Sequence, residues 1–140
     1  MSAFLWALVT ACIWGIVPVM EKAGLAGPVA PTIGVMIRSL GVAGGFLLVC
    51  LVVPPWSALR SVGWPAAALL AGGGFLASVV GQLAFYHALK GGALNQVTPV
   101  AGAYPLVAVI LSWVLLREPL TASRLLGAAC VVAGVFLLRK

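Results

Sequence analysis

Apolar residues gather in five long runs that occupy almost the whole chain, and short polar or proline-containing segments separate them. About 20 residues form a helical span, so each run is long enough, or nearly long enough, to cross a bilayer. Proline supports several boundaries because it stops a helix but is tolerated in the first turn. We predict helices at residues 3–20, 31–53, 64–89, 93–116 and 121–138. The pattern therefore indicates an all-α membrane protein, a five-transmembrane-helix bundle forming a single domain over residues 1–140.

The composition supports a lipid environment. Hydrophobic residues make up 64% of the chain and charged residues 7%, whereas a soluble domain usually carries about 25% charge. The net charge of +6 does not indicate nucleic-acid binding, because most Lys and Arg residues flank the apolar runs instead of forming a basic stripe. We expect the lipid bilayer as a partner and no nucleic acid.

The sequence contains no residue pattern that indicates catalysis or metal binding. The three cysteines, Cys12, Cys50 and Cys130, lie far apart inside apolar runs and have no metal-ligand spacing. No metalloprotease, serine hydrolase or phosphate-loop motif is present. We therefore expect no enzyme activity, no metal and no cofactor.

Five crossings place the two ends of the chain on opposite faces of the membrane. Positive residues tend to stay cytoplasmic, so their count on each face sets the orientation. One face carries Arg60, Arg117 and Arg124, and the other carries Lys22, Lys90, Arg139 and Lys140. This small difference leaves two interpretations open: a fixed orientation with a weak signal, or insertion in both orientations.

Polar residues inside the spans recur at helical spacing. Gly74, Ser78, Gln82 and Tyr86 repeat every four residues in the third run, which places them on one helical stripe. Such stripes either line a substrate cavity or form hydrogen bonds between helices, and both interpretations stay open. The residues predicted to line a substrate pathway are Trp14, Arg38, Ser78, Gln82, Tyr86, Asn95, Thr98, Tyr104 and Pro105.

Arg38 is the most informative single residue. It lies seven residues after Pro31, roughly 10 Å into the span at 1.5 Å per residue. It shares a helix face with Gly34, and small residues on that face allow another helix to approach closely. We predict that Arg38 points into protein; the alternative is a side chain that snorkels to the interface. The glycines predicted to serve helix packing are Gly41, Gly45, Gly127 and Gly134.

Ionisable groups that could couple transport to an ion are scarce. The chain has no Asp, and its acidic residues are Glu21 and Glu118, both near span ends. We therefore name Glu21 and His87 as the candidate coupling residues. Pro105 lies near the middle of the fourth run, where it removes a backbone hydrogen bond, as in the broken helices of transporter cavities; a passive kink is the alternative.

Several motifs occur together in a characteristic order. They are Trp14-Gly15 with Lys22, Pro31 with Arg38, Tyr104-Pro105, Arg117-Glu118-Pro119-Leu120-Thr121, Leu126-Gly127-Ala128 and Gly134-Val135. With this order and spacing, the chain resembles one EamA domain of the drug/metabolite transporter superfamily over essentially its whole length.

The resemblance implies a multi-pass small-molecule transporter of the bacterial inner membrane. Most relatives fuse two such domains into ten helices with inverted halves, so this chain is similar to half of a ten-helix drug/metabolite transporter fold. We expect an antiparallel homodimer that moves a small metabolite or amphipathic solute by alternating access. Two alternatives remain: an accessory or regulatory membrane subunit, and one half of a heterodimeric transporter with a paralogous partner.

Overall fold

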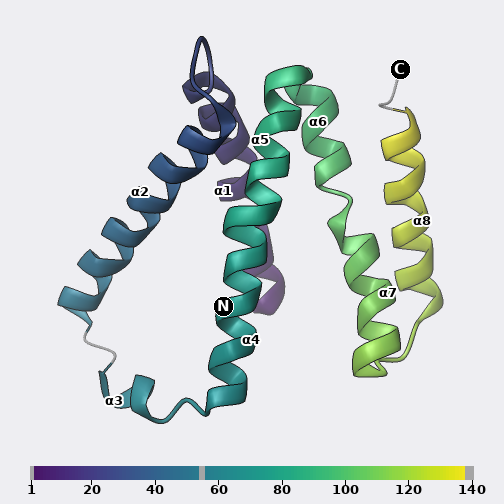
Figure 1. The fold of residues 1–140 in the computed structure, drawn as a ribbon. Coiled ribbons are helices and arrows are strands. Elements are labelled where there is room, and N and C mark those ends of the chain that lie inside the picture. The colour runs from purple at the N-terminus through teal and green to yellow at the C-terminus, as the bar shows by residue number, and fades with distance from the viewer. Residues whose placement is uncertain (1, 54–55, 138–140) are drawn as a thin grey trace. The chain divides into compact units, whose positions relative to one another are not determined.

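The computed structural model describes residues 2–53 and 56–137, which form helices joined by short connections and contain no strand (Figure 1). By their contacts, the residues divide into two compact units, Met1–Gly91 and Gly92–Lys140.

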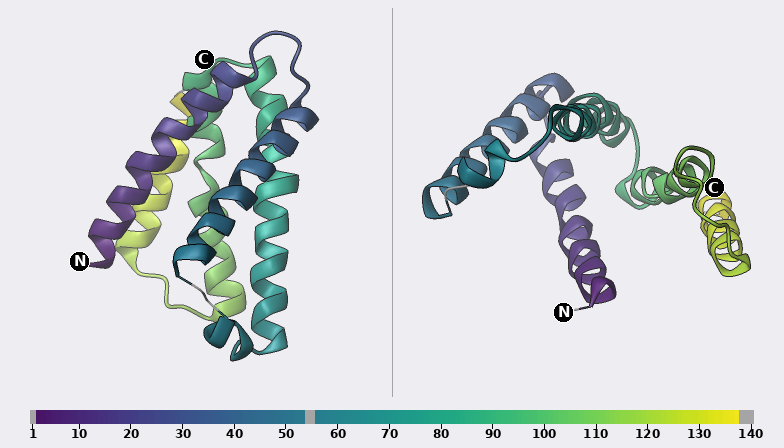
Figure 2. Two further views of the ribbon diagram at one scale, coloured as in Figure 1. Left: turned by 90° about the vertical axis from the view of Figure 1, so that its left-hand side faces the viewer. Right: turned by 90° about the horizontal axis from the view of Figure 1, so that it is seen from below.

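The first unit consists of two long helices, a short helix and a third long helix. These elements are α1 (Ala3–Gly24), α2 (Pro31–Val52), α3 (Trp56–Arg60), α4 (Trp64–Phe75), the π-helical segment η1 (Leu76–Gly81) and α5 (Gln82–Gly91). The last three follow one another without a break and together form the span Trp64–Gly91. The left view in Figure 2 shows α1 and α2 as separate rods joined by the loop between them.

Local chemistry sets the ends of the first two helices. The Ser2 hydroxyl accepts a hydrogen bond from the Leu5 backbone N–H at the start of α1, as a helix N-cap does. Gly27 adopts a φ of 71° in the following loop, a conformation that glycine reaches without steric cost. Pro31 stands in the first turn of α2, where its missing N–H has no consequence.

The small core of the first unit lies where α1, α2 and α5 meet. Helix α2 packs mainly on α5, and α1 also contacts α5. Buried apolar side chains here are Leu25, Val35, Tyr86 and Leu89. Two lysines then tie the helix ends together: Lys22 donates to the Leu89 carbonyl oxygen, and Lys90 donates to the Gly27 carbonyl oxygen at 3.0 Å.

The π-helical segment changes the expected stripe in the third long helix. A π turn holds more residues than an α turn, so side chains before and after it no longer follow the four-residue period. The sequence pattern treats Ser78 and Gln82 as neighbours on a regular α-helix, but Ser78 lies inside η1 and Gln82 begins α5. The predicted helix at residues 64–89 is observed as the continuous span Trp64–Gly91, and η1 is a local departure from α-helical geometry within it.

The second unit contains three helices, α6 (Leu94–Ala101), α7 (Tyr104–Leu116) and α8 (Ala122–Leu137). The chain leaves the helix at Gly102 and Ala103, directly before Tyr104-Pro105. Pro105 explains the interruption, since it lacks an N–H and its ring clashes with the carbonyl four residues earlier. The break thus lies just before Pro105, which stands in the first turn of α7.

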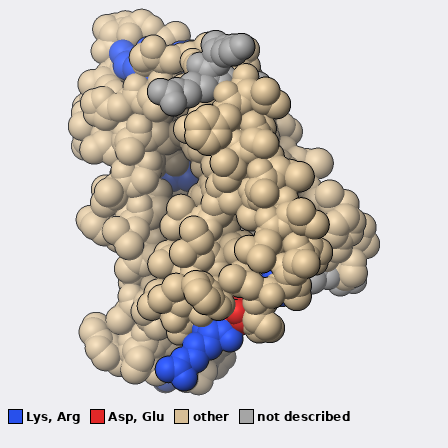
Figure 3. All heavy atoms as spheres, turned by 90° about the vertical axis from the view of Figure 1, so that its right-hand side faces the viewer, with Lys and Arg blue, Asp and Glu red and all other residues tan. Residues whose placement is uncertain are grey.

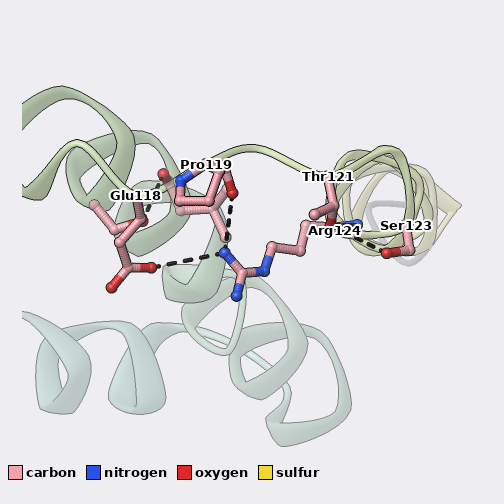
Figure 4. A network of polar contacts seen from close by, with 7 residues as sticks. Glu118, Pro119, Thr121, Ser123 and Arg124 are labelled. Carbon is pink, nitrogen blue, oxygen red and sulfur yellow. Dashed lines mark hydrogen bonds and ion pairs between the residues drawn. The ribbon is translucent and has the colours of Figure 1, made fainter.

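The connection between α7 and α8 is held by its own polar residues (Figure 4). Thr121 Oγ1 accepts from the Arg124 backbone N–H at 3.4 Å, the contact of a helix N-cap at the start of α8. The Arg124 guanidinium donates to the Pro119 carbonyl oxygen at 3.1 Å and lies 3.7 Å from Glu118 Oε2. Arg117 ends α7 with a left-handed φ of 54°.

The predicted class, an all-α membrane protein, is confirmed. The helices long and apolar enough to cross a membrane are Phe4–Gly24, Pro31–Val52, Trp64–Gly91 and Leu94–Leu116, and Ala122–Leu137 is a shorter apolar helix. Large apolar side chains are exposed along these helices, including Leu40 and Leu51 at 72% each. Charged atoms are correspondingly rare on the surface in Figure 3. Such a surface is stable when lipid or another protein covers it.

Candidate functional site

A single carboxylate oxygen organises the polar interior of the first unit. Glu21 Oε1 accepts hydrogen bonds from Gln82 Nε2 at 2.9 Å and from the Tyr86 hydroxyl at 3.0 Å. The Arg38 Nε atom lies 3.2 Å from the same oxygen and completes an ion pair. The Glu21 side chain is 10% exposed and the Arg38 side chain 30%. The four residues form what we call the Glu21 cluster.

Each member of the Glu21 cluster comes from a helix that packs in the first unit. Glu21 lies in the last turn of α1, Arg38 in the second turn of α2, and Gln82 and Tyr86 one turn apart in α5. Helix α1 extends to Gly24, beyond the predicted end at residue 20, so Glu21 is fixed on a helix face. A π-helical segment, of the kind often found at functional sites, directly precedes Gln82.

The cluster leaves hydrogen-bonding capacity unused. Three donors converge on Glu21 Oε1, whereas Oε2 has no partner among the described residues. Arg38 Nη1 is shielded from solvent and likewise has no hydrogen-bond partner among them. An unsatisfied donor of this kind costs about 1–3 kcal/mol, and more for a charged group. The site therefore offers an acceptor and a donor that the described residues do not saturate.

A pocket of about 470 Å³ adjoins the cluster. Glu21, Arg38 and Tyr86 line it together with apolar side chains, among them Val17 and Ile37. Small-molecule sites are typically apolar pockets of about 300–1,000 Å³ with a few polar groups that orient the ligand. In size and lining, this pocket matches that description.

Gly34 controls how closely α2 approaches the cluster. A Cβ atom at this position would lie 2.8 Å from Leu25 Cδ2 and 2.9 Å from both Cδ2 and Cε2 of Tyr86. Contacts this short are sterically excluded, so glycine is required for the observed packing of the Tyr86 ring. Sequence reasoning placed Gly34 on the Arg38 face but missed its contact with Tyr86.

The structure gathers four of the residues singled out in the sequence and leaves others elsewhere. Arg38 points toward α1, which agrees with an inward-facing side chain. Trp14 and His87 are exposed, and Ser78 is half-buried in η1 without a described contact to Glu21. The pathway residues Asn95, Thr98, Tyr104 and Pro105 belong to α6 and α7 of the second unit.

The glycines predicted to serve helix packing have no neighbour in the described chain. A Cβ atom at Gly41, Gly45, Gly127 or Gly134 would meet nothing within 4 Å. Their packing role therefore stays a prediction. Among residues 2–53 and 56–137, no three His, Cys, Asp or Glu side chains lie close enough together to hold a metal ion.

Comparisons with known proteins agree with the helical pattern. The model of the EamA-like transporter family matches residues 1–140. The chain is also 35% identical over 60 residues to an uncharacterized protein of Methanocaldococcus jannaschii, a match that covers 43% of this chain and 44% of that protein. The match thus spans less than half the length of this relative. No solved structure matches the chain. Because the family model covers the chain from end to end, the protein belongs to the EamA-like transporter family.

Proposed function

We propose that the chain is a membrane transporter that carries a small metabolite or amphipathic solute by alternating access. The observation that carries the proposal is the Glu21 cluster beside an apolar pocket of about 470 Å³. An ion pair within a membrane span is costly to maintain unless it serves structure or a transport pathway. Membership of the EamA-like transporter family favours the second role.

In this proposal, the Glu21 cluster is the polar end of the solute site. The apolar walls hold the body of the solute, and Glu21 and Arg38 orient its head. Hydrogen bonds from Gln82 and Tyr86 hold the carboxylate in place before the solute arrives. Rearrangement of these contacts between two conformations would open the pocket to one side of the membrane at a time.

We further propose that two copies assemble as an antiparallel homodimer. In this arrangement each copy would cross the membrane five times, through the four long apolar helices and the shorter helix Ala122–Leu137. Inverted repeats that rock about a midplane site are a common basis of alternating access, and a second inverted copy would supply the other half. The resemblance noted in the sequence favours the bacterial inner membrane as the location.

A second candidate function is that of a membrane subunit with a partner of another sequence. The partner would be either a paralogous half of a heterodimeric transporter or a membrane protein that this chain regulates. Extensive exposed apolar surface on the helices fits either assembly. Reporters fused to the C-terminus separate these arrangements. Signal on both sides of the membrane supports the homodimer, and signal on one side only removes it.

Transport is tested with the purified chain alone in liposomes. Entrance counterflow is suitable, because transient accumulation of a labelled solute requires a carrier and does not arise from leakage. The labelled solutes are leucine, phenyl β-glucoside and ethidium, which represent amino acids, sugars and cationic drugs. Counterflow of any of them, absent from protein-free liposomes, supports transport by the lone chain. Its absence for all three contradicts that proposal.

A further inference from the structure

We propose that the pocket beside the Glu21 cluster selects amphipathic molecules whose polar head has no net charge and carries a hydrogen-bond donor next to an acceptor. A primary amide and an alcohol are heads of this kind. The inference rests on the proposed function, because it names the class of solute for the same site. It is argued from the charges, open hydrogen-bonding atoms and walls of the pocket.

Charge balance excludes a strong preference for an ion. Glu21 and Arg38 are the charged residues that line the pocket, and their 3.2 Å ion pair is neutral as a whole. Lys22 is the next residue to Glu21 but does not line the pocket, and its ammonium group is directed to the Leu89 carbonyl oxygen. A charged head would lose its hydration in this apolar surrounding without gaining a net countercharge. A head without net charge avoids that loss.

The open atoms of the cluster define the head more closely. Glu21 Oε2 has no partner among the described residues, so it can accept a hydrogen bond from a solute. Arg38 Nη1 lacks a partner among the same residues, so it can donate one. Because Nη1 is shielded, donation to a solute requires the partly exposed guanidinium to turn toward the pocket while its Nε atom keeps the ion pair with Glu21. One head that carries both a donor and an acceptor satisfies both atoms.

The walls of the pocket define the rest of the molecule. Apolar side chains from α1 and α2 line it, including Val17, Met20, Ile37 and Val42. Burial of an apolar body against them contributes about 25 cal/mol per Å² removed from water. The volume of about 470 Å³ accommodates a body of the size of a phenyl ring or a short alkyl chain.

Three molecules with the same phenyl body test the inference: phenylacetamide, phenylacetate and 2-phenylethylammonium. Binding to the detergent-solubilised chain is measured by ligand-observed NMR titration. We expect the amide to bind about tenfold more tightly than either ion, which corresponds to 1.4 kcal/mol. Micelles without the chain correct for partition of the ligands, and the double variant Glu21→Gln/Arg38→Gln, which is uncharged at both positions, should show no preference between the two ions.

Single variants must shift the preference in opposite directions. Glu21→Gln leaves the Arg38 charge alone, so the affinity for phenylacetate should rise about tenfold relative to the amide. Arg38→Gln leaves the carboxylate alone, so 2-phenylethylammonium should gain by a similar factor. If the ion pair has a purely structural role, each single variant should bind all three ligands more weakly, and the preference should not shift in opposite directions. If a single variant does not fold, the order of the three affinities in the wild-type chain and the affinities of the double variant still test the inference.

Tightest binding of either ion by the wild-type chain, equal binding of all three molecules, or binding of none overturns the inference. These outcomes are independent of the liposome experiment. Counterflow with a preference for an ion keeps the transport proposal and removes the inference. Preference for the amide without any counterflow keeps the inference and removes transport by the lone chain.

Discussion

Replacement of Gly34 by alanine should displace the Tyr86 ring and weaken the first unit. The added Cβ would lie 2.8 Å from Leu25 Cδ2 and 2.9 Å from two ring atoms of Tyr86. Optimal carbon–carbon contacts are about 3.5–4.0 Å, so each contact is short by roughly 0.6 Å or more. Tyr86 is 3% exposed and Leu25 5%, so a shift of either side chain disturbs buried contacts.

The expected change in the free energy of unfolding follows from two destabilising effects and one stabilising effect. Overpacking of a filled core costs about 1–3 kcal/mol. A shift of the Tyr86 hydroxyl from its 3.0 Å contact with Glu21 weakens a hydrogen bond to a charged group, which contributes about 1.5–3 kcal/mol. Alanine in place of glycine stabilises a helix by about 0.5–1 kcal/mol in the opposite direction. We expect Gly34→Ala to lower the free energy of unfolding by roughly 1.5–5.5 kcal/mol, toward the lower end where the hydrogen bond is weakened and not lost.

Unfolding by SDS in mixed micelles measures this free energy. Gly44→Ala is the matched control, because it makes the same change in the same helix where a Cβ would meet nothing within 4 Å. The control should be neutral or stabilising by up to about 1 kcal/mol. In a Tyr86→Leu background, the cost of Gly34→Ala should fall by about 0.5 kcal/mol or more, since the two residues are in contact. Equal stabilities of the Gly34 and Gly44 variants would refute the steric reasoning.

Three further predictions concern the polar residues. Gln82→Ala should weaken binding of phenylacetamide while the stability falls by about 1.5–3 kcal/mol, because Gln82 donates to the Glu21 carboxylate; unchanged NMR affinity would contradict this. Arg124→Gln should change the free energy of unfolding by less than about 1 kcal/mol, because its ion pair is half exposed; a larger loss would contradict this. Thr121→Ala should destabilise the start of α8 by about 1 kcal/mol, detectable as faster amide exchange there; unchanged exchange would exclude the cap.

The sequence predicts the helices well because their cause is local. Apolar runs and proline boundaries place the long helices close to where the structure has them, such as Pro31–Val52 against residues 31–53. The end of α1 is different, because the pattern stops at residue 20 whereas the helix continues to Gly24. A charged residue interrupts the apolar pattern and so indicates the end of a span. Glu21 nevertheless lies within the helix, and its partners lie on α2 and α5.

The candidate site is less accessible to sequence reasoning because its contacts join residues far apart in the chain. Arg38, Gln82 and Tyr86 were each predicted to line a pathway and Glu21 to act in coupling, but nothing local reveals that three of them meet at one oxygen of the fourth. The π-helical segment has no signature in the apolar pattern. The requirement for glycine at position 34 depends on a ring more than fifty residues away.

The most direct test of Glu21 as part of a transport site is entrance counterflow by the lone chain after Glu21→Gln. The matched control is Glu118→Gln, which removes the other acidic side chain, a half-exposed one in the α7–α8 connection. With a solute that the wild-type chain carries, we predict that Glu118→Gln retains counterflow and Glu21→Gln changes its rate or its preference among solutes. Counterflow by Glu21→Gln with the rate and solute preference of the wild type would contradict the assignment of the Glu21 cluster to the transport pathway.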